Sequence, residues 1–159
     1  MRPKTRWLLA LCVVVMTVLT SCGLQSGSAV PLPVEPGSIQ PVPGLEGAQL
    51  IVGSKEFTEQ VILGYILEFG LVAAGADVRD LTNISGSNST RQAMVSGQVD
   101  VTYEYTGTAW INFLGNETAI PDATGQFEAL RDQDAGNGLT WVNPAPMDNT
   151  YALAMQARA

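Results

Sequence analysis

Short apolar runs alternate with longer segments of helical periodicity from residue 49 onward, and this alternation limits the fold more than any other feature of the chain. Gln49 to Gly53 is an apolar run that ends in glycine, which is typical of a buried strand. Val99 to Tyr105 alternates with period two and is the clearest strand pattern. Because helical segments separate the strands, the pattern predicts an α/β fold with parallel neighbours and helices on both faces of the sheet. Strands are expected at residues 49–53, 76–81, 99–105, 139–142 and 150–155.

The helical segments have recognisable ends. Apolar residues recur at helical spacing from Thr58 to Ala74, and Gly75 follows where a left-handed C-terminal cap is expected. Ser89 and Gln92 have the spacing of a capping box, which predicts a short helix that ends at Gly97. Further helices are expected over residues 109–114, closed by a glycine, and over residues 125–134.

The first 21 residues have the layout of a secretory signal peptide. Basic residues precede an apolar run from Trp7 to Leu19, which is shorter than the roughly 20 residues that a membrane-spanning helix needs. Leu19-Thr20-Ser21-Cys22 resembles the bacterial lipobox, which implies that Cys22 receives a diacylglyceryl group and becomes the mature N-terminus. The alternative is an ordinary signal peptide in which Cys22 is incidental.

Prolines dominate the segment that follows. Residues 22–48 are rich in Pro, Gly and Ser, and proline at that density favours a semi-extended chain. We expect this segment to tether the folded part to the membrane. The expected organisation is therefore a lipoprotein signal peptide over residues 1–21, a tether over 22–48 and a folded part over 49–159.

The composition excludes several function classes. The net charge is −7, which argues against a nucleic-acid partner because such a partner needs a basic surface. The chain has no histidine, and its two cysteines lie in the leader and in the lipobox. The folded part therefore lacks the commonest general base, metal ligand and nucleophile. We expect no enzyme activity, no cofactor and no metal site.

Four blocks of the sequence are distinctive: Ile51 to Gly64 (IVGSKEFTEQVILG), Gln92 to Asp100 with the Gly- and Ser-rich turn before it, Tyr103 to Ala109 (YEYTGTA), and Asn149 to Leu153 (NTYAL). In this order they resemble the glycine betaine/choline/carnitine/proline-betaine-binding proteins of ABC importers. The resemblance implies a type II periplasmic-binding-protein-like fold with two lobes that close on the ligand. The resemblance also implies that residues 49–159 are a partial solute-binding domain, which holds mostly one lobe plus the first crossover strand.

A quaternary ammonium ion has no N–H to donate, so aromatic faces bind it better than hydrogen-bond acceptors do. Tyr105 ends the period-two strand at a carboxyl edge, where open α/β sheets place their ligands. The resemblance implies that Tyr105 and Tyr151 are cage residues, with Thr108 and Asn149 in the same pocket. It also places Lys55 at the polar end of the ligand, where an ammonium suits a carboxylate and favours betaine-type ligands over choline.

Other roles for these residues stay open at this point. Lys55 can be a solvated turn lysine, and a tyrosine at a strand end usually serves packing. We expect Phe57 in the core, and we expect the carboxylates of Glu59 and Glu104 on solvated faces.

The resemblance implies a solute-binding component on the outer face of the cytoplasmic membrane, lipid-anchored, whose partners are a small quaternary-ammonium ligand and ABC permease subunits. The alternative is a membrane-tethered sensor or interaction module of the same fold.

Overall fold

The computed structural model describes residues 33–35 and 37–149. The expected signal peptide, Cys22, Tyr151 and the expected crossover strand at 150–155 lie outside these residues. Within the described part no helix is both long and apolar enough to cross a membrane.

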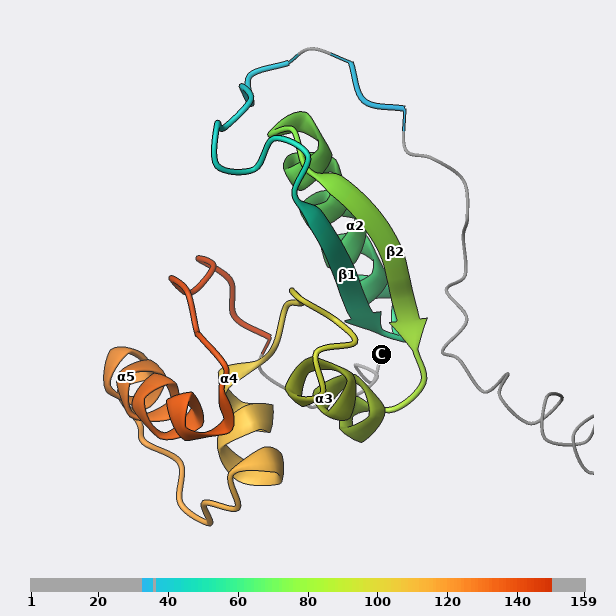
Figure 1. Ribbon diagram of the computed structural model, residues 1–159. Coiled ribbons are helices and arrows are strands. Elements are labelled where there is room, and N and C mark those ends of the chain that lie inside the picture. Colours follow the sequence, from blue (N-terminus) through green and yellow to red (C-terminus); the bar gives the residue numbers. More distant parts are fainter. Residues whose placement is uncertain (1–32, 36, 150–159) are drawn as a thin grey trace, which may run out of the picture.

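The centre of the fold is a parallel pair of strands joined by a helix (Figure 1). β1 (Gln49–Lys55) pairs with β2 (Asp77–Ile84), with Gln49 opposite Asp77, and α2 (Thr58–Ala73) connects them. Gly75 has a φ of +102°, so the chain leaves α2 through the left-handed region as the sequence predicted. The first two strands and the helix between them are confirmed.

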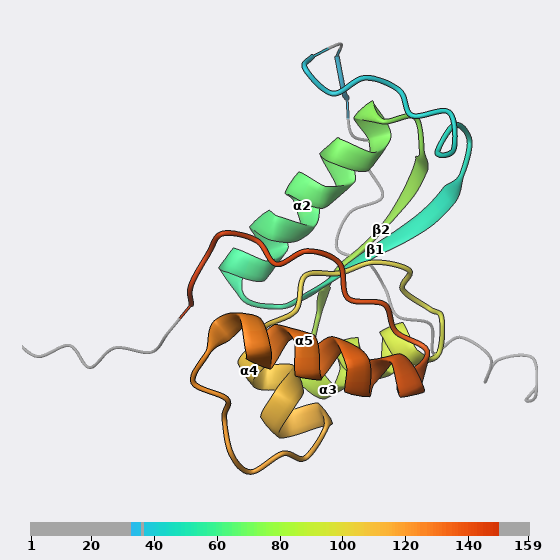
Figure 2. The ribbon, with the colours of Figure 1, turned by 90° about the vertical axis from the view of Figure 1, so that its left-hand side faces the viewer.

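Helices pack on both faces of this strand pair. In β1 the side chains alternate, so Val52 and Ser54 face α2, while Ile51 faces α3 (Ser87–Val95). Figures 1 and 2 show α2 along one side of the strands and α3 beyond their carboxyl ends. A core cluster joins β2 to α3 and the segment after it through Leu81, Ile84, Ala93 and Val99. The prediction of an α/β layer structure is confirmed.

The approach of α2 to the sheet depends on one glycine. A Cβ atom on Gly64 would lie 2.8 Å from Thr82 Cγ2 and 3.2 Å from Ser54 Cβ. The residues of α2 that are fully buried are Gln60, Gly64 and Glu68, one turn apart on the face toward the sheet. The helix therefore turns a polar stripe toward the strands.

The prediction of a strand over residues 99–105 is wrong beyond its start. Only Val101 bridges to Val52, in parallel, and Gly53 N donates to Val101 O at 3.0 Å. Pairing then stops, because the chain turns to bring Glu104 against Lys55 at the end of β1. Tyr105, expected as the last strand residue, instead has the N-cap position of the next helix.

A second group of helices lies beyond the carboxyl ends of the strands (Figure 2). It comprises α4 (Thr106–Thr108), a π-helical turn (Ala109–Phe113), α5 (Ala123–Asp134) and a 3₁₀ turn (Ala135–Asn137). Its core consists of Ala109, Trp110 and Leu130. The helices predicted near 109–114 and 125–134 are confirmed.

Two smaller predictions are wrong. Residues 139–142 form no strand, because Trp141 turns its indole toward α5 and donates to Asp134 Oδ2 at 2.7 Å. The capping box at Ser89 is absent, since α3 begins two residues earlier, with Gly86 as its N-cap and no side-chain cap.

The segment before β1 lies against the far end of α2 and the start of β2. Val42 N donates to Ala74 O at 2.8 Å, and Gly47 N donates to Gly75 O at 2.9 Å. Asp77 N donates to Ala48 O at 2.8 Å. These hydrogen bonds fix the residues that enter β1 at the end of the sheet opposite the carboxyl ends of the strands.

Candidate functional site

Lys55 ends β1 and is buried, with only 1% of its side chain exposed. Its Nζ donates to Glu104 Oε1 at 2.6 Å. The ammonium also lies 5.1 Å from the centroid of the Tyr105 ring and 5.9 Å from that of Phe113, which is within the range of cation–π attraction. Lys55 is therefore a paired lysine inside the site, and the reading of it as a solvated turn residue is wrong.

Tyr105 lies at the point where the chain leaves the sheet edge and enters α4. Its backbone N donates to Glu104 Oε1 at 2.7 Å, and its hydroxyl donates to Glu59 Oε1. Its ring stacks on Phe57, with the ring centroids 6.0 Å apart and the ring planes 20° apart. Burial and then the hydrogen bond to Glu59 raise the pKa of the Tyr105 hydroxyl.

Asn149 is 90 residues further along the chain than Glu59 and meets the same carboxylate. Its Nδ2 donates to Glu59 Oε1 at 3.0 Å. Thr108 ends α4, three residues after Tyr105, and is half-buried. The structure thus joins Lys55, Tyr105 and Asn149 through direct contacts or a shared partner, places Thr108 nearby in the chain, and leaves Tyr151 outside the described residues.

Two residues of this cluster have other positions than the sequence analysis expected, and a third has contacts that it did not predict. Phe57 was expected in the core, but 42% of it is exposed and its ring lies against Tyr105. Glu104 was expected on a solvated face, but its side chain is only 12% exposed and accepts two hydrogen bonds within the site. Glu59 is exposed, as expected, and it also accepts two hydrogen bonds there. A sequence signal existed for all three, because they lie inside the blocks IVGSKEFTEQVILG and YEYTGTA.

The charges of the cluster do not balance. It holds one ammonium, on Lys55, and two carboxylates, on Glu59 and Glu104. Aromatic faces from Tyr105 and Phe57 border these charges. An excess of carboxylate beside exposed aromatic surface suits a ligand that carries a positive charge and methyl groups.

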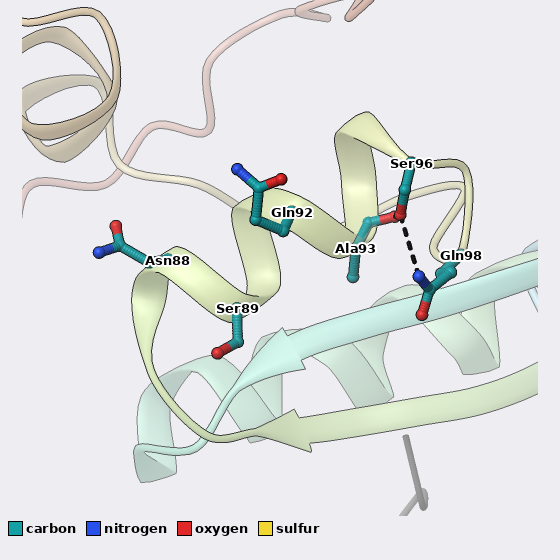
Figure 3. A pocket seen from close by; sticks show the side chains of 6 residues that line it. All are labelled: Asn88, Ser89, Gln92, Ala93, Ser96 and Gln98. Carbon is teal, nitrogen blue, oxygen red and sulfur yellow. Dashed lines mark hydrogen bonds between the residues drawn. The ribbon is translucent and has the colours of Figure 1, made fainter. Parts of the chain in front are cut away.

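Two surface hollows lie apart from this cluster. One lies along α3 and the turn after it and is lined by small and amide side chains, where Gln98 Nε2 donates to Ser96 Oγ at 3.2 Å (Figure 3). The other lies between the start of α2 and the end of β2. Neither lining includes Lys55, Tyr105, Thr108 or Asn149. Among the described residues, no group of three His, Cys, Asp or Glu side chains gathers that could hold a metal ion.

Comparisons with known proteins give the family and the relatives of this chain. Residues 48–159 match the family described as the substrate binding domain of ABC-type glycine betaine transport system. A glycine-betaine-binding protein of Pseudomonas aeruginosa is 39% identical over 113 residues, which cover 70% of this chain and 36% of the relative. An ergothioneine transport permease/ergothioneine binding protein, EgtU, of Helicobacter pylori is 34% identical over 70% of this chain and 20% of the relative.

A solved structure shares the fold. The apo form of YehZ from Escherichia coli superposes with a TM-score of 0.60 at 31% sequence identity, covering 65% of this chain and 38% of that one. The fold is therefore that of the periplasmic-binding-protein-like proteins, as the sequence resemblance implied. The chain spans about a third of the length of the Pseudomonas relative and of YehZ.

Proposed function

Because the chain belongs to the family of substrate-binding domains of ABC-type glycine betaine transport systems, we propose that it is the solute-capturing component, or part of one, of an importer for quaternary-ammonium osmolytes. The ligand class comprises glycine betaine, carnitine, choline and proline betaine. The family is one of binding proteins and not of enzymes.

One observation of the site carries the ligand class. The Lys55 ammonium lies 5.1 Å from the centroid of the Tyr105 ring, so this ring already attracts a cation. A trimethylammonium group fits such a face because the ring quadrupole attracts its charge and the ring carbons contact its methyl groups, which contributes about 0.5–2 kcal/mol per ring. Phe57, stacked beside Tyr105, extends the aromatic surface. Tyr151 would add a further ring.

Lys55 also supports a zwitterionic ligand. An ammonium has three N–H donors, and Glu104 accepts from it at 2.6 Å. Two further N–H donors of the ammonium would bind the carboxylate of a betaine, with Thr108 and Asn149 as further polar partners, and this requires the buried Lys55 to become accessible when the ligand enters. This arrangement favours betaine and carnitine over choline, whose far end is a neutral hydroxyl.

The location and the partners are also part of the proposal. The protein binds its ligand on the outer side of the cytoplasmic membrane, closes on it and passes it to the permease subunits of an ABC importer. A lipid on Cys22 would keep the protein at the membrane. A second membrane-binding group, such as another acyl chain, would make this attachment stable.

Calorimetric titration tests the ligand class. Glycine betaine, carnitine, choline, proline and ergothioneine are titrated into residues 22–159 and into a chimera that joins them to the remaining part of the Pseudomonas relative. We expect the chimera to bind betaine and carnitine, and to lose roughly tenfold or more in affinity when Tyr105→Leu removes the ring. Tyr65→Leu, in α2 outside the cluster, is the matched control. Equal affinity of the Tyr105→Leu and Tyr65→Leu chimeras, or no binding of any methylated ammonium, would overturn the proposal.

Labelling with radioactive palmitate in a bacterial host tests the anchor separately. We expect label on the wild-type chain and on Cys12→Ser, which changes the cysteine inside the apolar run. We expect none on Cys22→Ser, which should also leave the membrane fraction. Label that persists on Cys22→Ser would contradict the lipid anchor without affecting the ligand class.

A further inference from the structure

Glu59 connects parts of the candidate site that are far apart in the sequence. It lies in the first turn of α2, and its Oε1 accepts hydrogen bonds from the hydroxyl of Tyr105 and from Nδ2 of Asn149, the latter at 3.0 Å. These partners are 46 and 90 residues away along the chain. Figure 2 shows the segment that ends at residue 149 passing the first turn of α2. One carboxylate oxygen thus links three segments.

Glu59 contributes little to the stability of α2 itself. An acidic residue in the first turn of a helix gains about 0.3–1 kcal/mol from the helix dipole. The side chain does not cap α2, whose N-cap is Phe57 and has no side-chain cap hydrogen bond. Within the described part of the chain, the side-chain hydrogen bonds of Glu59 all come from residues of the candidate site.

The contacts restrict two side chains that the ligand would meet. The Tyr105 ring is held at its hydroxyl by Glu59 and on one face by Phe57, so both its position and its plane are set. The Asn149 amide is held through Nδ2, and among the described residues its carbonyl oxygen has no hydrogen-bond partner, so it is able to accept one. A ligand that meets side chains already held in place loses less conformational entropy on binding.

We propose that Glu59 is a positioning residue of the ligand site, whose carboxylate holds the Tyr105 ring and the Asn149 amide in one arrangement before the ligand arrives. This inference rests on the proposed function for the identity of the ligand. Its geometric part concerns only the three side chains and is testable without any ligand.

The first test is a spectroscopic titration of the tyrosines of the 159-residue chain. Ionisation of each tyrosine is followed by ultraviolet absorbance at alkaline pH, and subtraction of the Tyr105→Phe curve isolates Tyr105. In the wild type we expect Tyr105 to ionise above the ordinary value of about 10, because burial and the Glu59 carboxylate both oppose its negative charge. In Glu59→Gln the charge is gone and the Tyr105 transition should move toward lower pH.

Glu56→Gln is the matched control for this titration. Glu56 is an exposed carboxylate three residues earlier, and it accepts from Gly86 N at 2.9 Å rather than from Tyr105. Its removal changes the net charge by the same amount. A Tyr105 transition that moves equally in both variants, or in neither, overturns the inference. Far-ultraviolet circular dichroism checks folding, and Glu59→Asp, which keeps the charge and shortens the side chain, replaces Glu59→Gln if the latter fails to fold.

The second test is ligand affinity in the chimera described above. Glu59→Ala frees both side chains, and we expect betaine to bind roughly 5- to 100-fold more weakly, whereas Glu56→Ala should bind as the wild type does. Unchanged affinity in Glu59→Ala overturns the positioning role even if the Tyr105 titration moves. If the wild-type chimera binds no methylated ammonium, the proposed function fails, and the tyrosine titration still decides the arrangement of the three side chains.

Discussion

Two carboxylates among the described residues are fully buried, and their surroundings differ in the number of hydrogen-bond donors and in the charge of the nearest ionised neighbour. Asp134, at the end of α5, accepts from Arg91 through both Nη atoms, from Trp141 at 2.7 Å and from Asn137 at 2.9 Å. Glu68, in the middle of α2, has no hydrogen-bond partner for either oxygen and lies beside the carboxylate of Asp80 on β2. Both side chains have 0% exposure.

The two surroundings shift the pKa values in opposite directions. Burial by itself would raise the pKa of Asp134, but the donors from Arg91, Trp141 and Asn137 outweigh it and lower the pKa to about 2. Burial, reinforced by the negative charge of Asp80, raises the pKa of Glu68 to about 7. A buried acid in this protein therefore stays ionised only where donors converge on it. The junction of α3 with α5 is built around such convergence, whereas the interface of α2 with the sheet is not.

Removal of the charge partner of Asp134 gives the largest expected effect on this comparison. Arg91→Ala leaves a buried carboxylate without its cation, which typically costs about 3–5 kcal/mol of the free energy of unfolding. Urea unfolding at pH 7, followed by tryptophan fluorescence, measures the loss. Arg131→Ala is the control, because Arg131 pairs with Asp132 on the surface and exposed pairs contribute about 0–1 kcal/mol. A loss for Arg91→Ala as small as that for Arg131→Ala would mean that the donors around Asp134 are not what holds the junction.

Glu68→Gln gives an effect of intermediate size, and it depends on pH. The folded pKa of Glu68, about 7, lies above the ordinary value of 4.5, so its contribution to stability is full below pH 4.5 and is lost as the pH rises through about 7. Over that window the wild type should lose about 3 kcal/mol through this group. Glutamine does not ionise, so the free energy of unfolding of the variant relative to the wild type should rise by a similar amount between pH 4.5 and pH 8.

Urea unfolding at intervals of pH measures this difference, with Glu128→Gln, at an exposed position, as the control. Parallel pH profiles for Glu68→Gln and the wild type would show that Glu68 is not the buried acid of that interface.

The sequence predicted the regular part of this fold well and its junctions poorly. β1, α2 and β2 follow from local periodicity, since each buries a continuous face. The strand over 99–105 fails after Val101, because alternation of side chains says nothing of whether a partner strand continues. Trp141 likewise has strand-like neighbours in the sequence, but its conformation is set by the hydrogen bond that its indole donates to the carboxylate of Asp134.

The residues of the candidate site also fall into two groups, those that the sequence indicated and those that it did not. Lys55 and Tyr105 were placed from their positions at the edge of the sheet and from the motif blocks. Glu59 and Glu104 looked like ordinary surface acids, because their partners are 46 to 90 residues away in the sequence and no local pattern records such a contact. Polar contacts between residues far apart in the chain are therefore the feature that the sequence alone predicts least well.

The smallest expected effect concerns the packing that keeps α2 against the sheet and Glu68 away from water. At Gly64 an added methyl group would lie 2.8 Å from Thr82 Cγ2, and overpacking of this kind costs about 1–3 kcal/mol, while the better helix propensity of alanine returns about 1 kcal/mol. Gly64→Ala should therefore lower the free energy of unfolding by up to about 2 kcal/mol.

Gly70, in the same helix, is the matched control. Among the described residues, a Cβ atom on Gly70 would have only Ile39 Cδ1 near it, at 4.0 Å, so Gly70→Ala keeps the propensity gain without the clash and should stabilise the protein by about 0.5–1 kcal/mol. Urea unfolding of the two variants at pH 5, where Glu68 is largely protonated, separates packing from ionisation. Opposite signs are the expected result, and equal signs would mean that α2 does not approach β2 as closely as this interface requires.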